Sequence, residues 1–380
     1  MKILAICFQY DDPMPVIASN LLGELTSEHT IDVLSNDVFV KPIEGLRHHY
    51  IHQFPEEHRE LQRQLIKWTG RTPISYFWSR RAAKVVARDY DVVLAFMDNA
   101  NLTSIVAGEY LSKKLGCKFA LYTVDAFPAP GGWLRKKVDF WNKKRIANRI
   151  FSAADLIGAS NSHMLDYQLS VCKPKPTTKG VVLLTPSPMQ RESYPKSEEL
   201  LFLYTGNLYG LRNPDHIFKA FKRVLALYPT ANFMIVGTIV QLRNMEQILT
   251  EEERKHIIIG KHTNNLAPLF ERAKVLVDID ADREKDPFMS SKIVSYLKVN
   301  RVILSETGKI TPSREMFAGL NTVVQCDHNE ESLYEGMLRA IELADSNPDF
   351  SEREPLVEKF SIERVASILN ESLKELHNTK

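Results

Sequence analysis

Short apolar runs alternate with longer amphipathic stretches from one end of the chain to the other. Short apolar runs bounded by polar or turn residues are typical of buried strands. Amphipathic stretches such as residues 214–229 and 265–274 instead repeat their apolar positions with the period of a helix. Strands that alternate with helices predict βαβ units and a parallel sheet. We expect strands at residues 2–8, 30–35, 91–97, 118–124, 155–160, 180–185, 200–206, 232–237, 256–261, 275–280, 301–305 and 321–326.

The pattern of elements divides the chain in two. With 380 residues the chain is too long for one typical core, so two domains are expected. A proline-rich stretch without an apolar period lies near the middle and predicts a linker. Each half holds enough strands for its own doubly wound sheet. We expect an α/β protein with a Rossmann-like domain at 1–185, a linker at 186–199, a second Rossmann-like domain at 200–360, and a C-terminal helix at 361–380 that could cross back to the first domain.

Composition narrows the class of protein. Hydrophobic residues make up 44% of the chain and charged residues 25%, which fits a soluble globular protein. The net charge of +2 does not favour nucleic acid as a partner. No apolar stretch approaches the ~20 residues of a membrane span, and the apolar start is too short for a signal peptide. With four widely spaced cysteines, reduced thiols are the simplest interpretation. The expected location is the cytoplasm, with contact at the inner face of the cell membrane still open.

A glycine-containing loop opens the second half. A strand ends at Gly206, and a loop with Asn207 leads through Arg212 to a helix that begins at Asn213 and Pro214. A glycine turn that runs into a helix start beside a fixed cation can hold phosphate oxygens. Taken alone, the pattern also fits a plain helix cap with Arg212 on the surface.

A lysine stands in the first turn of another helix, where its charge faces the positive end of the helix dipole. This is Lys292, and Ser290 or Ser291 can cap the helix that it begins. Helical spacing puts Lys292, Ser295 and Tyr296 on one face, which we expect to point away from the core. Lys292 beside free backbone N–H groups would form an anion site, although a solvated lysine is the alternative. A diphosphate held by both Arg212 and Lys292 would explain the unfavourable placement.

Five segments of the second half then resemble one known family in order and spacing. They are "YTGNLYGLRNPDHIFKAF" at 204–221, "ANFMIVG" at 231–237, "HIIIGKHTNNLAPLFERAKVLVDID" at 256–280, "SSKIVSYLKVNRVILS" at 290–305 and "EKFSIERVASIL" at 358–369. Together they make this half similar to the donor-binding domain of GT-B fold glycosyltransferases, specifically the retaining glycosyltransferase family 4 of the capsule and exopolysaccharide type. The resemblance implies two Rossmann-like domains that face each other across a cleft.

The resemblance also implies a reaction. A sugar leaves a nucleoside diphosphate and passes to an acceptor hydroxyl with retention, in the synthesis of a surface polysaccharide or glycolipid. Fixed cations stabilise the negative charge on the departing diphosphate. The expected donor is a nucleotide-sugar such as a UDP- or GDP-sugar, with no cofactor and no metal. Arg212 and Lys292 would carry this chemistry, and the donor would also contact Gly206, Asn207, Gly237, Gly260, Lys261, Ser290, Ser291 and Ser295.

The chain departs from the family pattern at two positions. The arginine of the family's glycine loop is Asn207 here, and its lysine appears as Arg212. The glutamate that usually holds the ribose is Ser295, and its partner eight positions earlier falls on Pro287, beside Asp286. These departures favour a rival hypothesis, a non-catalytic sugar-nucleotide-binding partner of a transferase. A non-hydrolysing sugar-nucleotide epimerase is a second alternative on the same fold.

The first half offers a third catalytic candidate and two residues for the acceptor side. Asp125 follows a strand, and the resemblance implies a catalytic aspartate or histidine near the sugar there; a turn role is equally open. Asp98 also follows a strand but could cap the next helix, and Tyr10 could line the acceptor cleft. His48 and His49 stand in a polar stretch that we expect on the surface.

A D-x-D pattern and a basic segment bear on metals and partners. Asp278 and Asp280 could share one face of a strand, but we expect them to end the strand rather than bind a metal. Residues 133–149 contain seven basic residues and one acid, interleaved with Trp133 and Trp141. Basic residues with tryptophan suit an anionic membrane surface, whereas a solvated helix is the alternative. The expected partners are therefore a nucleotide-sugar donor, a lipid-linked or saccharide acceptor and an anionic membrane, and no nucleic acid.

Overall fold

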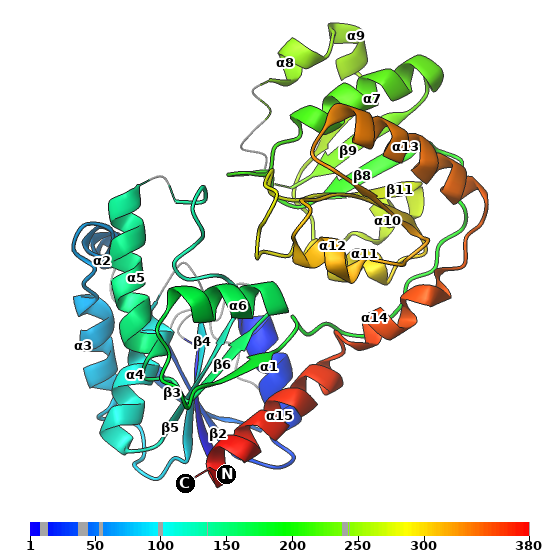
Figure 1. The fold of residues 1–380 in the computed structure, drawn as a ribbon. Helices are drawn as coiled ribbons and strands as arrows, with labels where there is room; N and C mark the ends of the chain where they lie inside the picture. The colour runs from blue at the N-terminus through cyan, green and yellow to red at the C-terminus, as the bar shows by residue number, and fades with distance from the viewer. Residues whose placement is uncertain are drawn as a thin grey trace. The chain divides into compact units, whose positions relative to one another are not determined.

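The computed structural model describes residues 1–7, 14–36, 45–52, 56–97, 102–134, 136–237, 242 and 244–379. These residues form two compact units, shown in Figure 1. Unit 1 consists of Met1–Pro188 together with Lys359–Lys380, and unit 2 consists of Met189–Glu358. No helix in the described part of the chain is long and apolar enough to cross a lipid bilayer.

Unit 1 is built on a parallel sheet with the strand order β3-β2-β1-β4-β5-β6-β7. Every neighbouring pair in it is parallel, and consecutive strands are joined through helices at most of the crossovers. The strands are β1 (Lys2–Ile6), β2 (Thr30–Asn36), β3 (Arg47–Ile51), β4 (Val92–Met97), β5 (Lys118–Thr123), β6 (Leu156–Ala159) and β7 (Lys179–Val182).

Helices cover both faces of this sheet and give unit 1 two cores. One core includes Trp78, Ile105 and Ile150 from three different helices. The other core joins the first helix of the chain to the last one, through residues such as Leu21 and Leu373. The helices are α1 (Met14–Leu25), α2 (Glu56–Thr69), α3 (Pro73–Ala82), α4 (Thr103–Leu115), α5 (Lys137–Phe151), α6 (Ser162–Val171) and α15 (Ile362–Asn378). Residues from the far end of the sequence thus complete the fold of unit 1.

Unit 2 repeats the architecture with a parallel sheet in the order β10-β9-β8-β11-β12-β13. Its strands are β8 (Leu201–Thr205), β9 (Asn232–Val236), β10 (Ile257–Gly260), β11 (Val275–Ile279), β12 (Val302–Glu306) and β13 (Val323–Cys326). Its helices are α7 (Asp215–Leu227), α8 (Met245–Ile248), α9 (Glu251–Arg254), α10 (Ala267–Arg272), α11 (Lys292–Leu297), α12 (Pro312–Met316), α13 (Glu330–Asp345) and α14 (Glu354–Glu358), with a 3-10 turn at Phe350–Arg353. The apolar sides of β8, β11 and β12 pack with α7 and α13 in one core.

The expected α/β fold with two doubly wound parallel sheets is confirmed. All twelve strands expected from the apolar runs are present, but β3 was missed. It has the sequence Arg-His-His-Tyr-Ile, which has no apolar run, and it lies at the edge of its sheet. The expectation that His49 lies on the surface was wrong. Its side chain is 12% exposed because the ring nitrogen Nε2 lies 3.3 Å from Oδ2 of the buried Asp32.

Candidate functional site

The carboxyl ends of β8 and β11 mark the point where the strand order of unit 2 reverses. From β8 the chain moves outward to β9 and β10, and it then returns to the other side of β8 to form β11. The loops after β8 and β11 therefore lead away from each other, and in open parallel sheets the crevice at such a point is the usual ligand site. Gly206 and Arg212 follow β8, and Lys292 begins the helix after β11. The sheet topology thus brings the three predicted residues to one edge.

Two glycines let the loops after β8 and β9 touch. Gly206 has a φ of 129° and Gly237 a φ of 149°, both in a region that side chains rarely adopt. A Cβ atom on Gly237 would lie 2.1 Å from the carbonyl oxygen of Gly206, and one on Gly206 would lie 3.0 Å from Cε of Lys292. Both glycines therefore have a packing role, and they bring the backbone of the β8 loop onto the Lys292 side chain.

Lys292 buries its charge at the start of α11. Its Nζ lies 3.0 Å from Oδ1 of Asp278 and donates a hydrogen bond to Oγ of Ser290 at 2.7 Å. The same ammonium lies 4.4 Å from the ring centroid of Tyr204, a cation–π distance. The Lys292 side chain is only 8% exposed, and that of Asp278 is fully buried. The positive charge at the helix start is thus balanced by a carboxylate of the neighbouring strand.

The predicted outward face of α11 was wrong. Tyr296 is fully buried, and its hydroxyl accepts a hydrogen bond from the backbone N–H of Thr205 at 2.8 Å. Ser291 stands at the helix N-cap without a side-chain cap bond, while the hydroxyl of Ser290 accepts from Lys292 instead. The helix has six residues and is enclosed by the strands beside it, so helical periodicity alone did not define a solvent-facing side.

Arg212 supplies the second cation of the site. It is half-buried in the loop between β8 and α7, and its guanidinium carbon lies 5.4 Å from the ring centroid of Tyr209. Burial by itself lowers the pKa of Arg212, but the nearby Tyr204, Asp280, Tyr209 and Asp278 outweigh this and raise it. Its Nε is buried and has no hydrogen-bond partner among the described residues. Arg212 therefore has a hydrogen-bond donor to offer a ligand.

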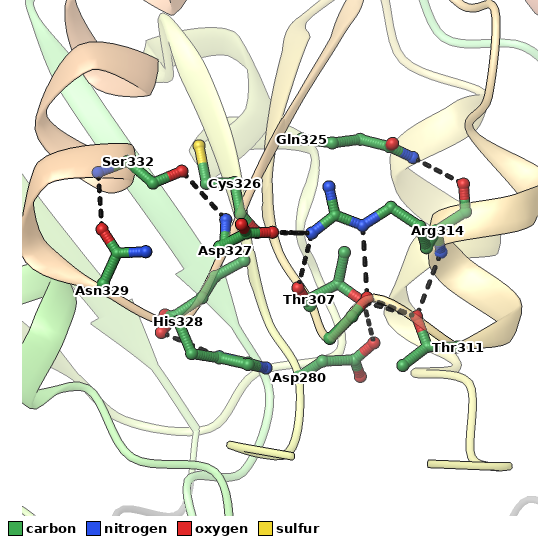
Figure 2. Close-up of polar contacts among 12 residues, drawn as sticks. Asp280, Thr307, Thr311, Arg314, Gln325, Cys326, Asp327, His328, Asn329 and Ser332 are labelled. Atoms are coloured by element: carbon green, nitrogen blue, oxygen red, sulfur yellow. Dashed lines mark hydrogen bonds and ion pairs between the residues drawn. The ribbon is translucent and has the colours of Figure 1, made fainter. Parts of the chain in front are cut away.

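A second polar network surrounds Asp280 at the end of β11 (Figure 2). The Asp280 carboxylate accepts hydrogen bonds from Oγ of Ser313 at 2.9 Å and from Oγ1 of Thr307 at 3.3 Å. Burial, together with the charge of Asp278, raises the pKa of Asp280 to about 7. Arg314 extends the network, because it donates to the carbonyl oxygen of Thr307 at 2.8 Å and to Oδ1 of Asp327 at 2.6 Å. The network ties the carboxyl ends of β11, β12 and β13 together.

Glu306 and His328 form a buried pair at the ends of β12 and β13. Nδ1 of His328 lies 3.1 Å from Oε1 of Glu306, and the two side chains are 10% and 1% exposed. Burial raises the pKa of Glu306. Burial alone would lower the pKa of His328, but the hydrogen bond and charge of Glu306 outweigh it and raise it. Both shifts favour the protonated form of the group concerned. In the described structure, Oε2 of Glu306 and Nε2 of His328 have no hydrogen-bond partner.

The remaining residues predicted for unit 2 lie along the same edge of the sheet. Asn207 follows Gly206, and its carbonyl oxygen accepts from the hydroxyl of Tyr204 at 3.2 Å. Gly260 ends β10, and the exposed Lys261 follows it. Ser295 is half-buried within α11.

In unit 1, Asp125 follows β5 at the carboxyl edge of the sheet, and its carbonyl oxygen accepts a hydrogen bond from Oγ1 of Thr123. It is half-buried. Tyr10 and Asp98, the two acceptor-side candidates, lie outside the described residues.

Several residues of the site were not expected to have a role in it. The expectation that Asp278 and Asp280 merely end a strand missed the ion pair with Lys292 and the buried carboxylate at the sheet edge. Their alternation in the strand was the available signal, because alternate residues share one face. Glu306 had a signal too, as a single acid that ends an otherwise apolar run. In the described part of the chain, no group of three or more His, Cys, Asp or Glu side chains could hold a metal ion.

No protein-family model matches this chain, and no curated protein matches it in sequence. Solved structures do match the fold. A sucrose-phosphate synthase from Thermosynechococcus elongatus matches with 12% identity and a TM-score of 0.68, over 100% of both chains. The lipopolysaccharide outer core galactosyltransferase WaaB matches with 14% identity and a TM-score of 0.65, over 99% of both chains. The catalytic domain of starch synthase IV from Arabidopsis thaliana, bound to ADP and acarbose, matches with 10% identity and a TM-score of 0.63, over 99% of this chain and 98% of that one. These similarities place the fold of this chain with the GT-B glycosyltransferases.

The same fold is also found in an epimerase. A Listeria monocytogenes protein described as a UDP-N-acetylglucosamine 2-epimerase matches with 13% identity and a TM-score of 0.55, over 100% of this chain and 97% of that one. Fold alone therefore does not separate sugar transfer from epimerisation, and the choice between them rests on the residues of the site.

Proposed function

We propose that this chain is a glycosyltransferase that moves a sugar from a nucleoside-diphosphate sugar to an acceptor hydroxyl. The observation that carries the proposal is the pair of cations at the switch point of unit 2, where Arg212 and Lys292 come together from two different loops. The fold supports it, because enzymes that transfer sugars share it over the full chain. Transfer with retention, an acceptor in surface polysaccharide or glycolipid synthesis, and membership of family 4 belong to the same proposal.

Arg212 is the residue that we assign to the donor diphosphate. Its Nε carries an unused donor, and a guanidinium forms strong paired hydrogen bonds with phosphate oxygens. Negative charge that builds on the departing diphosphate would be stabilised by this cation in the transition state more than in the ground state. The Lys292 side chain lies against the backbone of Gly206. A bound diphosphate would compete with Asp278 for the Lys292 ammonium.

The other predicted residues take roles that follow from their strands. Gly206, Asn207, Ser290 and Ser291 lie on the segments that lead to the two cations, and we assign them to the phosphates. Gly237 follows β9, Gly260 ends β10 and Lys261 follows it. We assign these three residues to the base, with Ser295 as the ribose contact. Asp125 is assigned a catalytic role near the transferred sugar. Tyr10 and Asp98, which lie outside the described residues, belong to the acceptor side. No metal or cofactor is part of the proposal.

Thermal unfolding with UDP, GDP and ADP, each with and without magnesium, tests the donor site. A nucleotide at 100 times its dissociation constant adds about 2.7 kcal/mol to the stability of the folded protein. We expect one of the three nucleotides to raise the melting temperature without magnesium. Arg212→Gln should abolish that increase, because it removes the cation with the unused donor. Arg339→Gln, which removes an exposed arginine from α13, is the matched control and should keep it.

If Arg212→Gln kept the full nucleotide-dependent rise in melting temperature, Arg212 would not belong to the donor site. If no nucleotide raised the melting temperature of the wild type, the donor site itself would be refuted. If magnesium were required for the shift, the assignment of the diphosphate charge to protein cations alone would be wrong. The nucleotide that stabilises the chain identifies the base, and sugars on that nucleotide are screened next.

Two other functions can be distinguished from sugar transfer by the products that form during turnover. The serine at position 295, where the resembling enzymes have a ribose-binding glutamate, favours a non-catalytic sugar-nucleotide-binding partner of a transferase. Such a partner would bind the nucleotide and transfer no sugar to any acceptor. An epimerase would convert the nucleotide-sugar without an acceptor. Product analysis of the donor with and without lipid-linked or saccharide acceptors therefore separates the three.

The proposal places the chain in the cytoplasm, at the inner face of the cell membrane. The basic, tryptophan-bearing segment at 133–149 supports it, since such segments suit anionic lipid surfaces.

A further inference from the structure

A pocket in unit 1 is lined only by residues of that unit, none of which belongs to the candidate donor site. It has a volume of about 730 Å³ and lies among α3, α4, α5 and the turn between α2 and α3. Lys113 and Lys114 stand in the last turn of α4, and Arg149 stands in the last turn of α5. These helices lead into β5 and β6, so these three cations lie toward the amino ends of those strands.

The pocket is strongly basic and has an aromatic wall. Four cations line it, namely Arg71, Lys113, Lys114 and Arg149, against the single carboxylate of Glu109. Two of the four cations share the Glu109 carboxylate, which lies 2.8 Å from Nζ of Lys113 and 2.9 Å from Nε of Arg149.

Arg71 and Lys114 are exposed and form no ion pair among the described residues, so they leave uncompensated positive charge at the pocket. Tyr76 and Tyr110 form the aromatic wall, with ring centroids 5.3 Å apart in an edge-to-face arrangement.

Exposed apolar side chains also lie on α3 and α5, two of the helices that line this pocket. On α5, Val138 and Trp141 are 51% and 63% exposed, and helical spacing continues their stripe through Arg145 to Arg149 at the pocket. Trp141 and Arg149 are eight positions apart, about 12 Å along the helix. Phe77, on α3 beside the pocket residue Tyr76, is 55% exposed. Large apolar side chains exposed together are a mark of an interaction surface.

The end of α2 adds a second tryptophan beside the pocket. Trp68 is 54% exposed and precedes the pocket residues Gly70 and Arg71 by two and three positions. The ammonium of Lys136, next to the start of α5, lies 4.9 Å from the ring centroid of Trp68, so the end of α2 meets the start of α5. The two helices, α2 and α5, lie side by side in Figure 1. Tryptophan and cations that alternate on one surface suit the boundary between lipid headgroups and acyl chains.

We propose that this pocket binds the phosphate group of an anionic phospholipid. Arg71 and Lys114 hold the phosphate, and Tyr76 with Tyr110 contacts the glycerol part of the headgroup. Trp68, Phe77 and Trp141 enter the interfacial layer of the bilayer around it. The charge of the pocket and the exposed aromatics together select this occupant, because a soluble phosphate ligand gives no reason for exposed indole rings beside the pocket. The site goes beyond the proposed sugar transfer and does not depend on it.

The test is sedimentation of the full chain with lipid vesicles. We expect binding to phosphatidylcholine vesicles that contain phosphatidylglycerol and little binding to phosphatidylcholine alone. The double variant Arg71→Gln/Lys114→Gln should bind the anionic vesicles roughly tenfold to thirtyfold more weakly, since each basic residue near the surface contributes about 1 kcal/mol. Arg47→Gln/Lys173→Gln removes one arginine and one lysine that are exposed elsewhere in unit 1, and should change binding about twofold or less.

Fluorescence and competing ligands decide the nature of the occupant. The indole emission should shift to shorter wavelength on anionic vesicles, and Trp141→Ser should reduce the shift. If the two double variants weakened vesicle binding equally, the pocket would not be the lipid-binding site. If glycerol phosphate bound at the pocket and vesicles did not, a phospholipid would not be the ligand. Binding of single-stranded RNA instead of vesicles would contradict the proposal in the same way. Both double variants should keep the nucleotide-dependent rise in melting temperature, so a failure here is distinct from a failure of the donor site.

Discussion

Asp280 shows how a single carboxyl group at the sheet edge affects the stability of unit 2. It is buried near Asp278 and the hydroxyls of Thr307 and Ser313, and burial together with the charge of Asp278 raises its pKa to about 7. The folded protein therefore keeps this proton up to about pH 7, whereas the unfolded chain releases it near pH ~4. Between these values the folded state binds more protons than the unfolded state, so stability falls as the pH rises. Above about pH 7 the loss is complete and the contribution is constant.

Asp280→Asn should therefore stabilise the protein at pH ~8 and change it little at pH ~4. A shift of about three pKa units corresponds to up to about 4 kcal/mol, and the coupling to Asp278 reduces the observed gain. Urea unfolding at several pH values measures it. Glu335→Gln, at an exposed position on α13, is the control and should leave the pH dependence of the wild type unchanged. Parallel pH curves for Asp280→Asn and the wild type would show that Asp280 titrates normally.

At the scale of elements, α11 is held by its contacts rather than by its own length. It has six residues, far fewer than a helix needs to be stable alone. The ion pair between Lys292 of α11 and Asp278 of β11 ties its first turn to the sheet, and the hydroxyl of Tyr296 ties its last turn to β8. A helix placed in this way can hold a cation at the switch point with little freedom of movement.

We expect Lys292→Met to destabilise the protein by about 3–5 kcal/mol, because it leaves the buried carboxylate of Asp278 without its partner. Asp278→Asn should cost a similar amount by stranding the ammonium. The double variant Lys292→Met/Asp278→Asn should recover most of the loss, since it removes both charges and keeps the volume of the side chains. A double-mutant cycle from urea unfolding gives the coupling energy.

If the stability losses of the two single variants simply added in the double variant, Lys292 and Asp278 would not interact as a buried ion pair. The double variant also separates stability from binding. If it is folded and shows no nucleotide-dependent stabilisation, Lys292 contacts the donor; if it keeps the full stabilisation, Lys292 only supports the loop after β8.

At the scale of the whole molecule, the last helix of the chain belongs to the unit formed by the first half. Leu369 and Leu373 of α15 are buried in the same core as Leu21 of α1. Asn370 and Lys374 add hydrogen bonds to the carboxylate of Glu28, at the turn that follows α1. Unit 1 is therefore incomplete until the end of the chain is present.

Leu373→Ala should destabilise unit 1 by about 2–5 kcal/mol, because it opens a cavity at a fully buried position between α1 and α15. Differential scanning calorimetry measures the effect. Leu61→Ala removes a leucine that is 52% exposed on α2 and should change stability by about 0.5 kcal/mol or less. Equal effects of the two substitutions would mean that α15 does not pack on unit 1 in solution.

Much of the fold could be predicted from the sequence, because buried parallel strands are continuous apolar runs that periodicity detects. The edge strand β3 could not, since its histidines and arginine carry no such signal. Gly206, Arg212 and Lys292 could be chosen as candidates from the sequence, because a glycine turn or a helix start follows a recognisable strand. Their positions were predicted, but the surroundings of Lys292 were not.

Apart from β3, the sequence by itself determined which segments become strands and which loops follow them, because these depend on local patterns of a few residues. Only the tertiary structure decided that Asp278 neutralises Lys292, that Tyr296 is buried, and that Arg212 keeps an unused donor. It alone also brought Arg71, Lys114 and Arg149 into one pocket. The physical reason is that charge balance and burial depend on which distant segments meet, and a period of two or of 3.6 residues carries no information about the partner on the other side.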